Sequence, residues 1–141
     1  MRFVRTVSIQ APPAQVWQVM SDVEAWPTWT ASVSSVQLLE AGPLHVGGRA
    51  RIRQPRLPVA TWRVTELVPG ASFTWAARGP GLRTTGTHEV APDGDWSVAT
   101  LTLDQEGLFG GLMGRLTKDL TERYLALEAE GLKRRSESHN A

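Results

Sequence analysis

The sequence APPAQVWQVMSDVEAWPTWT, residues 11–30, decides which fold the chain is expected to adopt. The pair Pro12-Pro13 can begin a helix, where a missing backbone N–H costs nothing, and apolar residues recur after it at helical spacing. Pro27 disfavours helical geometry at the residue before it, so the chain has to turn between Trp26 and Trp29. A short amphipathic helix and a tryptophan-rich turn therefore separate two regions that both read as strand.

Strand-like segments precede and follow this block. Residues 3–9 carry alternating apolar side chains, and six later segments are each bounded by turns that contain Gly or Pro. Those six segments are residues 33–39, 49–54, 59–67, 72–78, 82–90 and 97–106. Strands joined by such short turns pair with their neighbours, so the sequence predicts an antiparallel meander.

The last part of the chain returns to helical periodicity, which predicts one long helix over residues 108–133. Its apolar stripe consists of Leu112, Leu116, Leu120, Tyr124 and Leu127. A twisted sheet curls, and a single helix laid across its concave side cannot fill the space between them, so we expect an internal cavity. We also expect one domain over residues 1–135 and a disordered polar tail over residues 136–141.

The composition argues against several classes of protein. The 141 residues include 15 basic and 14 acidic side chains, a formal net charge of +1 that gives little support to nucleic-acid binding. The arginines of residues 49–56 fit the solvated face of a strand better than a phosphate-binding site. Cys is absent, which excludes disulfides and thiolate chemistry, and no run approaches the ~20 apolar residues of a membrane span. We expect a cytoplasmic protein.

Five features follow one another along the chain. They are Ile9-Gln10-Ala11-Pro12 leading into Val16-Trp17, Asp22 with Trp26-Pro27-Thr28-Trp29, Val46-Gly47-Gly48 before a strand, Trp62-Arg63-Val64-Thr65-Glu66 with Pro69-Gly70, and the closing helix. Over residues 2–135 the chain resembles the START-like (SRPBCC) superfamily, also called helix-grip or birch-pollen-allergen-like, in its polyketide cyclase/dehydrase and lipid-transport branch.

The resemblance implies an α+β helix-grip fold. In this fold a curved seven-stranded antiparallel sheet, built from one strand, two helices and six further strands, wraps around a long C-terminal helix. The resemblance also implies an internal cavity that holds a hydrophobic small molecule. It carries no catalytic residue to a position in this chain, so site residues have to be selected from side-chain patterns.

Strand parity, the alternation of side chains between the two faces of a sheet, selects candidate ligand-binding residues. They are Trp26, Trp29, Ile52, Gln54, Trp62, Val64, Phe73, Trp75, Thr84, His88, Leu112, Met113, Leu116 and Leu120. Because Trp26 and Trp29 lie on a turn, they are candidates for a lid or rim at the cavity mouth, and a purely structural role explains them equally well.

His88 is the best candidate for a catalytic residue, because it is the only histidine inside a strand and shares its face with Gly86 and Val90. A neutral imidazole can orient a carbonyl or transfer a proton, although a histidine in a strand is also a common structural residue. His45 falls in a loop and His139 in the tail, so no metal site is expected, and nothing in the sequence indicates a cofactor.

Three functions remain open. The first is binding of a hydrophobic or aromatic small molecule, lipid- or polyketide-like, in the cavity. The second is a polyketide cyclase/dehydratase in which His88 and Gln54, or a bound water, handle protons. The third is a protein-interaction module of the chaperone-activator kind, with exposed apolar surface near Leu108, Phe109 and Leu112, which a small, filled cavity would favour. The sequence indicates no oligomeric state.

Overall fold

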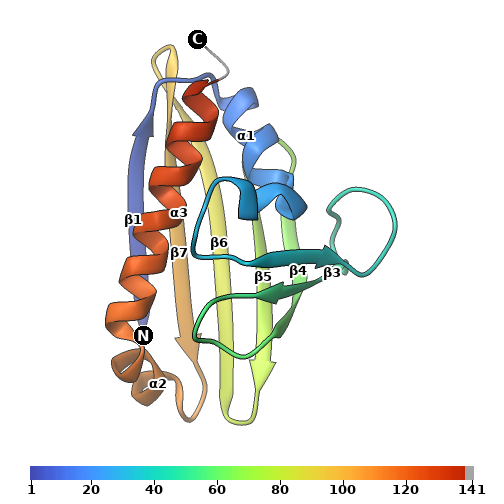
Figure 1. Ribbon diagram of the computed structural model, residues 1–141, viewed down its shortest axis with the longest axis vertical. Helices are drawn as coiled ribbons and strands as arrows, with labels where there is room; N and C mark the ends of the chain where they lie inside the picture. Colours follow the sequence, from blue (N-terminus) through green and yellow to red (C-terminus); the bar gives the residue numbers. More distant parts are fainter. Residues whose placement is uncertain (139–141) are drawn as a thin grey trace.

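The computed structural model describes residues 1–138, which form a curved sheet with helices on its concave side (Figure 1). The strands are β1 (Arg2–Ile9), β2 (Ser35–Leu38), β3 (Arg49–Arg53), β4 (Ala60–Val68), β5 (Ser72–Gly79), β6 (Leu82–Asp93) and β7 (Trp96–Glu106). The helices are α1 (Pro13–Ser21), the 3-10 helix η1 (Val23–Thr28), α2 (Gly110–Leu116) and α3 (Lys118–Ser138). The seven strands lie in the order β1-β7-β6-β5-β4-β3-β2, and every neighbouring pair is antiparallel, as predicted.

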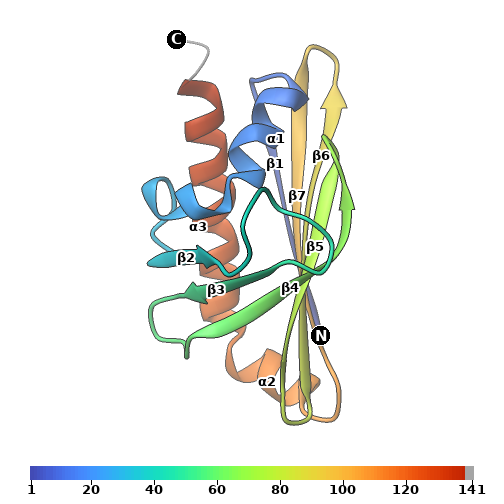
Figure 2. The ribbon, with the colours of Figure 1, turned by 90° about the vertical axis from the view of Figure 1, so that its right-hand side faces the viewer.

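The sheet is curved strongly enough to enclose space. In Figure 2, β3 and β2 turn away from the plane of β5, β6 and β7 toward α3. The register of β4 against β5 shifts between Val64 and Glu66, and an irregularity of this kind increases local twist. Trp62 and Val64 are buried on the concave side, whereas Glu66 beyond the shift is exposed.

Helix α3 is held tightly only along its second half. Ala129, Leu132 and Ser136 are almost completely buried there. A Cβ added at Gly131 would overlap the backbone carbonyl oxygen of Trp29, so the helix reaches the chain after η1 only because this residue is glycine. No helix within residues 1–138, α3 included, is long and apolar enough to cross a membrane.

The prediction of one unbroken helix over residues 108–133 is wrong. The helix is interrupted at Thr117, where the backbone N–H and the side-chain hydroxyl both donate to the carbonyl oxygen of Met113, at 2.9 and 2.8 Å. Both hydrogen bonds satisfy a carbonyl in the last turn of α2, which ends at Leu116. A new helix, α3, begins at the next residue.

The interruption changes which side of α2 faces the sheet. Gly110 and Gly114, four residues apart, are buried, and a Cβ on either would collide with Gln105 or Met1. The glycine face of α2 therefore lies against the end of the sheet. Leu112 and Leu116, predicted to lie on the inward stripe, are exposed instead.

The segment predicted as a disordered tail begins as helix, because α3 continues to Ser138. The carboxylate of Glu137 accepts hydrogen bonds from Lys133 Nζ at 2.6 Å and from the backbone N–H of Gln10 at 2.8 Å. The Lys133 bond, followed by the Gln10 bond, lowers the pKa of Glu137. The remainder of the predicted tail, with His139, lies outside the described residues.

The contact at Gly131 gives a test of the packing. Gly131→Ala is expected to lower the free energy of unfolding by about 1–3 kcal/mol, because the added methyl meets backbone that cannot move aside cheaply. Gly111→Ala in α2 is the matched control: nothing lies within 4 Å of its Cβ position, so helix propensity should raise stability by up to about 1 kcal/mol. Urea unfolding measures both, and equal effects at the two positions would contradict the assigned packing.

Candidate functional site

A cavity of about 660 Å³ lies between the concave side of the sheet and the first half of α3. The sheet contributes residues of β3 to β7, and α3 contributes Leu120, Thr121, Tyr124, Leu125 and Glu128. No residue of α3 after Glu128 lines the cavity within the described chain. The helix is therefore anchored by its second half and separated from the sheet by the cavity along its first half.

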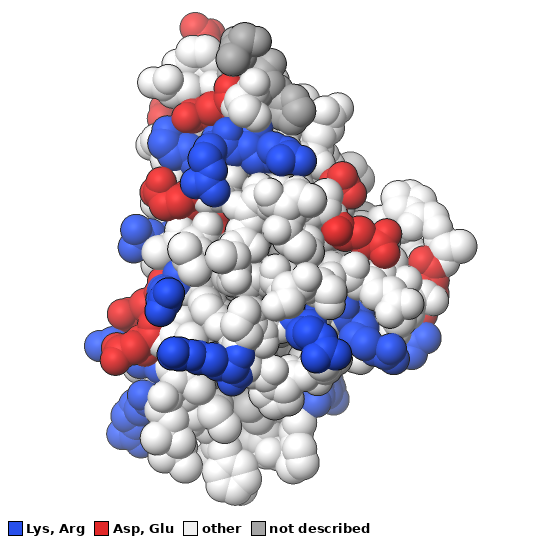
Figure 3. All heavy atoms as spheres, in the orientation of Figure 1, with Lys and Arg blue, Asp and Glu red and all other residues white. Residues whose placement is uncertain are grey.

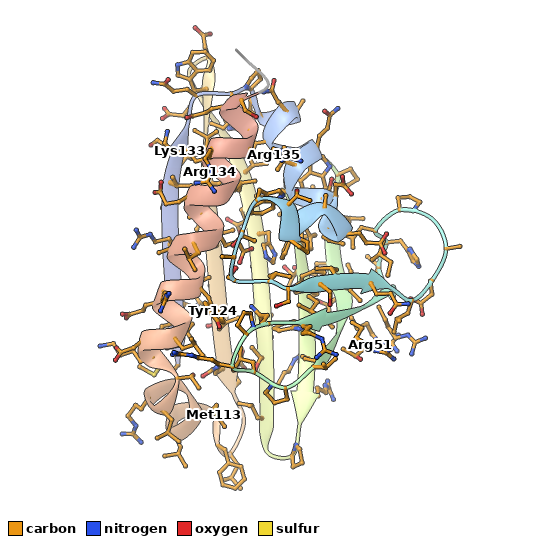
Figure 4. The ribbon with its side chains drawn as sticks, in the orientation of Figure 1. Arg51, Met113, Tyr124, Lys133, Arg134 and Arg135 are labelled. Atoms are coloured by element: carbon orange, nitrogen blue, oxygen red, sulfur yellow. The ribbon has the colours of Figure 1, made fainter. Side chains whose placement is uncertain are left out.

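The cavity opens at one place on its wall. Its exposed lining residues fall in only two segments, residues 57–61 and residues 78–79. The first belongs to the β3–β4 loop and the start of β4, the second to the β5–β6 hairpin. The Tyr124 hydroxyl donates a hydrogen bond to the Pro55 carbonyl oxygen, and Figure 4 shows this side chain reaching from α3 toward the loop. One side of the mouth is thereby tied to the helix.

Three indole rings form part of the apolar wall, beside aliphatic side chains such as Ile52 and Leu101. The centroid of Trp75 lies 5.4 Å from that of Trp26 and 6.0 Å from that of Trp62. Trp26 is fixed by a hydrogen bond of 3.0 Å from its Nε1 to the Met20 carbonyl oxygen. Gly86 on β6 gives the Trp75 ring room, because a Cβ there would lie 3.3 Å from its Nε1. A rigid, flat aromatic surface results.

A histidine and a glutamate face each other across the cavity wall. His88 on β6 places Nε2 3.2 Å from Oε1 of Glu128 on α3, and the two side chains are only 8% and 13% exposed. The imidazole is stacked on the Phe73 ring, with centroids 4.4 Å apart and planes inclined by 11°. The distance suits an ion pair once the imidazole is protonated, but the alignment is not that of a hydrogen bond, and Oε1 has no hydrogen-bond partner. No third His, Asp or Glu of residues 1–138 joins the pair to form a metal site.

Unpartnered polar atoms gather around this cavity. Among residues 1–138, six buried side-chain nitrogen or oxygen atoms have no hydrogen-bond partner. Four of them belong to cavity-lining residues, namely Trp62 Nε1, His88 Nδ1, Gln105 Oε1 and Glu128 Oε1. A buried polar group left unpaired costs about 1–3 kcal/mol, so a cluster of four needs an explanation beyond stability.

The structure brings nine of the predicted site residues together at the cavity: Trp26, Ile52, Gln54, Trp62, Trp75, Thr84, His88, Met113 and Leu120. It separates the other five from the cavity surface. Trp29, Val64 and Phe73 are buried but do not line the cavity, while Leu112 and Leu116 are exposed on α2.

A lid role for the two turn tryptophans does not fit their positions. Trp26 is only 3% exposed and Trp29 only 6%, and the exposed part of the cavity wall lies on other segments. Trp26 contacts Phe73, Trp75 and the His88 ring, so it belongs to the closed part of the wall.

Sequence reasoning missed Glu128 and Gln105. The apolar stripe predicted for the last helix contains leucines and Tyr124 but not Glu128. The sequence does contain a pattern that could have indicated Glu128. Polar residues recur at spacings of three and four, which places them along one line of a helix: Thr117, Thr121, Tyr124 and Glu128. All four line the cavity. Gln105 carries no comparable signal, because it lies near the end of a strand whose face assignment was ambiguous.

Residues 1–137 match the protein family described as Polyketide cyclase / dehydrase and lipid transport. The Actinorhodin polyketide synthase bifunctional cyclase/dehydratase of Streptomyces coelicolor is 32% identical to this chain over 109 residues. That match covers 64% of this chain and 34% of the relative, so the chain spans about a third of the length of the curated relative it matches.

Solved structures share the fold. The Zhui aromatase/cyclase from Streptomyces sp. R1128 superimposes with a TM-score of 0.80 at 19% identity, over 100% of this chain and 96% of that one. A START superfamily protein from Mycobacterium smegmatis gives a TM-score of 0.74 at 19% identity, over 97% of both chains. The START-like fold predicted from the sequence is thus confirmed, and the chain belongs to the polyketide cyclase/dehydrase and lipid transport family.

Proposed function

We propose that this protein binds one hydrophobic small molecule that carries aromatic rings together with hydroxyl or carbonyl groups. The observation that carries the proposal is a set of four buried polar atoms without hydrogen-bond partners, all in residues that line a largely apolar cavity. A volume of about 660 Å³ lies within the range of roughly 300–1,000 Å³ that is usual for small-molecule sites. A ligand with polar groups on a flat apolar body would satisfy both parts of the wall.

The wall also indicates the shape of the ligand. Trp26, Trp62 and Trp75 present rigid ring surfaces, which favour fused or conjugated rings of the polyketide kind over a flexible saturated acyl chain. A lipid-like ligand is the alternative within the same function. The Gln54 amide has less hydrogen-bonding capacity left for a ligand, because its Nε2 already donates to the Ser32 carbonyl oxygen at 3.2 Å.

A cytoplasmic location remains part of this proposal.

Two small probes test the polar half of the site. 2-Naphthol should bind the protein about tenfold more tightly than naphthalene, because its hydroxyl can pair with a buried polar atom. His88→Phe keeps a ring stacked on Phe73 but removes both nitrogens, so this ratio should fall to near one while naphthalene still binds. Fluorescence titration measures the four dissociation constants.

His45→Phe is the matched control, because His45 is exposed and does not line the cavity. An unchanged ratio in His88→Phe would contradict the assigned role of His88. A fluorescent fatty acid titrated in parallel tests the lipid-like alternative, and tighter binding of the fatty acid than of the naphthol would assign the cavity to acyl chains.

Replacing Glu128 should raise the stability of the protein but weaken ligand binding. Glu128→Leu removes a buried oxygen that has no hydrogen-bond partner, so the free energy of unfolding should rise by about 1–3 kcal/mol. Affinity for 2-naphthol should fall in the same variant. Glu130→Leu, at an exposed position of the same helix, should change neither quantity. A loss of stability in Glu128→Leu would show that the carboxylate supports the fold instead of serving the ligand.

A second candidate function, polyketide cyclase/dehydratase activity, is favoured by the His88–Glu128 pair. In a dehydration, the imidazole would take the proton from the carbon next to a ketone, and the hydroxyl on the following carbon would leave after receiving a proton. The products are an enone and one water. Glu128, 3.2 Å from Nε2, would stabilise the imidazolium formed between the two proton transfers.

Turnover separates the two candidates. If the protein is an enzyme, it should convert a cyclic β-hydroxyketone to the enone, and His88→Gln should slow this reaction by about a hundredfold or more. Enone absorbance follows the reaction. Wild-type protein that binds the ketone without converting it would refute the enzyme candidate and leave the binding function standing.

A small, filled cavity would favour the interpretation as a protein-interaction module. The cavity of about 660 Å³ does not meet that condition. The exposed apolar surface that the same interpretation expected near Leu108, Phe109 and Leu112 is nevertheless present.

A further inference from the structure

Two segments border the mouth of the cavity, residues 54–59 of the β3–β4 loop and residues 78–83 of the β5–β6 hairpin, and a third, residues 107–118 with α2, lies against the hairpin. We refer to them together as the mouth face. Each contributes residues that line the cavity. The hairpin and the third segment touch, because the Phe109 N–H donates to the Gly81 carbonyl oxygen at 2.8 Å and the Phe109 ring covers Gly81. The hairpin and α2 meet at the lower end of the molecule in Figures 1 and 2.

Large apolar side chains project into solvent from this face. Leu108 is 86% exposed, Leu116 73% and Leu112 52%. Phe109, Leu57 and Val59 are exposed on the same segments. Leu112 and Leu116 lie one turn apart on α2, Leu108 lies in the turn before it, and the opposite side of α2 is fixed against the sheet by its glycines. The exposed leucines of α2 are therefore held rigidly outward.

The charge of the mouth face differs from that of the rest of the chain. Its basic residues are Arg56, Arg78, Arg83, Arg115 and Lys118, and it contains no Asp or Glu. The whole chain carries +1, so the residues outside these three segments carry a formal −4. Two acidic residues border the mouth face: Glu106, which is the register partner of Arg83 across β6 and β7, and Asp119, which follows Lys118. The lower end of the space-filling view is uncharged and bordered by basic residues (Figure 3).

We propose that the mouth face docks onto the surface of a lipid bilayer that contains anionic headgroups. Protruding leucines can insert among acyl chains while arginine and lysine remain at the level of the phosphates. A second copy of the chain fits less well, because two such faces would bring like charges together. The inference rests on the proposed function in one respect: a cavity for apolar ligands that opens onto a bilayer exchanges them without passing through water.

Vesicle flotation tests the docking. Wild-type protein should float with phosphatidylcholine vesicles that contain phosphatidylglycerol, bind pure phosphatidylcholine weakly, and lose binding as salt rises. Leu112→Gln with Leu116→Gln should lower the partition coefficient by at least about tenfold. Arg115→Gln with Lys118→Gln should lower it about tenfold as well. Neither pair lines the cavity, so both variants should keep their affinity for 2-naphthol in solution.

Matched controls lie elsewhere on the surface. Val4→Gln with Val68→Gln removes two apolar side chains that are 56% and 55% exposed. Arg5→Gln with Arg134→Gln removes two exposed positive charges, the second of them on the second half of α3 (Figure 4). Both control proteins should bind vesicles like the wild type. Docking at the mouth face is refuted if wild-type protein does not float, if the controls lose binding equally, or if the leucine variant binds normally.

Gel filtration distinguishes the other possible occupant of the face. A wild-type dimer that becomes monomeric in Leu112→Gln/Leu116→Gln would assign the face to contact between copies, against the bilayer. Failure of the wild-type protein to bind 2-naphthol is a separate result. It would refute the proposed ligand-binding function, and the vesicle measurement would still test docking on its own.

Discussion

The close contact between Gly131 and the backbone at Trp29 determines where empty space can exist in this molecule. It lets the second half of α3 settle between β1, α1 and the chain after η1, where the buried residues of the helix are concentrated. The first half of the same helix is then too far from the strongly curved part of the sheet to fill the space. The cavity follows from a rigid helix that is pinned at one end over a surface that bends away from it.

Some of the residues that line the cavity lower the stability of the fold. Indole and aliphatic side chains bury well, yet four buried polar atoms in the lining residues lack hydrogen-bond partners, and two of them belong to the His88–Glu128 pair. A sequence selected for stability alone would replace such groups by apolar residues of similar size. Their presence beside a large cavity is the physical reason for the proposal that the cavity holds a ligand.

The strand faces were predictable because a two-residue period leaves little freedom: one buried tryptophan fixes the direction of its neighbours, as Trp62 does for Val64. The helix was predictable in its existence but not in its continuity. Leucines at 112, 116 and 120 have the same spacing whether or not the helix is broken at Thr117, and no periodicity reveals the close packing of Gly110 and Gly114 against Gln105 and Met1. Glu128 was missed for a related reason, since a charged residue on a long helix reads as solvent-facing until the opposing histidine is placed.

The split of α3 into an anchored half and a cavity-lining half has an evolutionary consequence. Substitutions at residues 117–128 change the shape and polarity of the binding space while the contacts around residues 129–136 continue to hold the helix in place. Selectivity can therefore diverge among descendants of such a chain without passing through unfolded intermediates. The same division offers a practical route to altered specificity, in which libraries are confined to one half of a single helix.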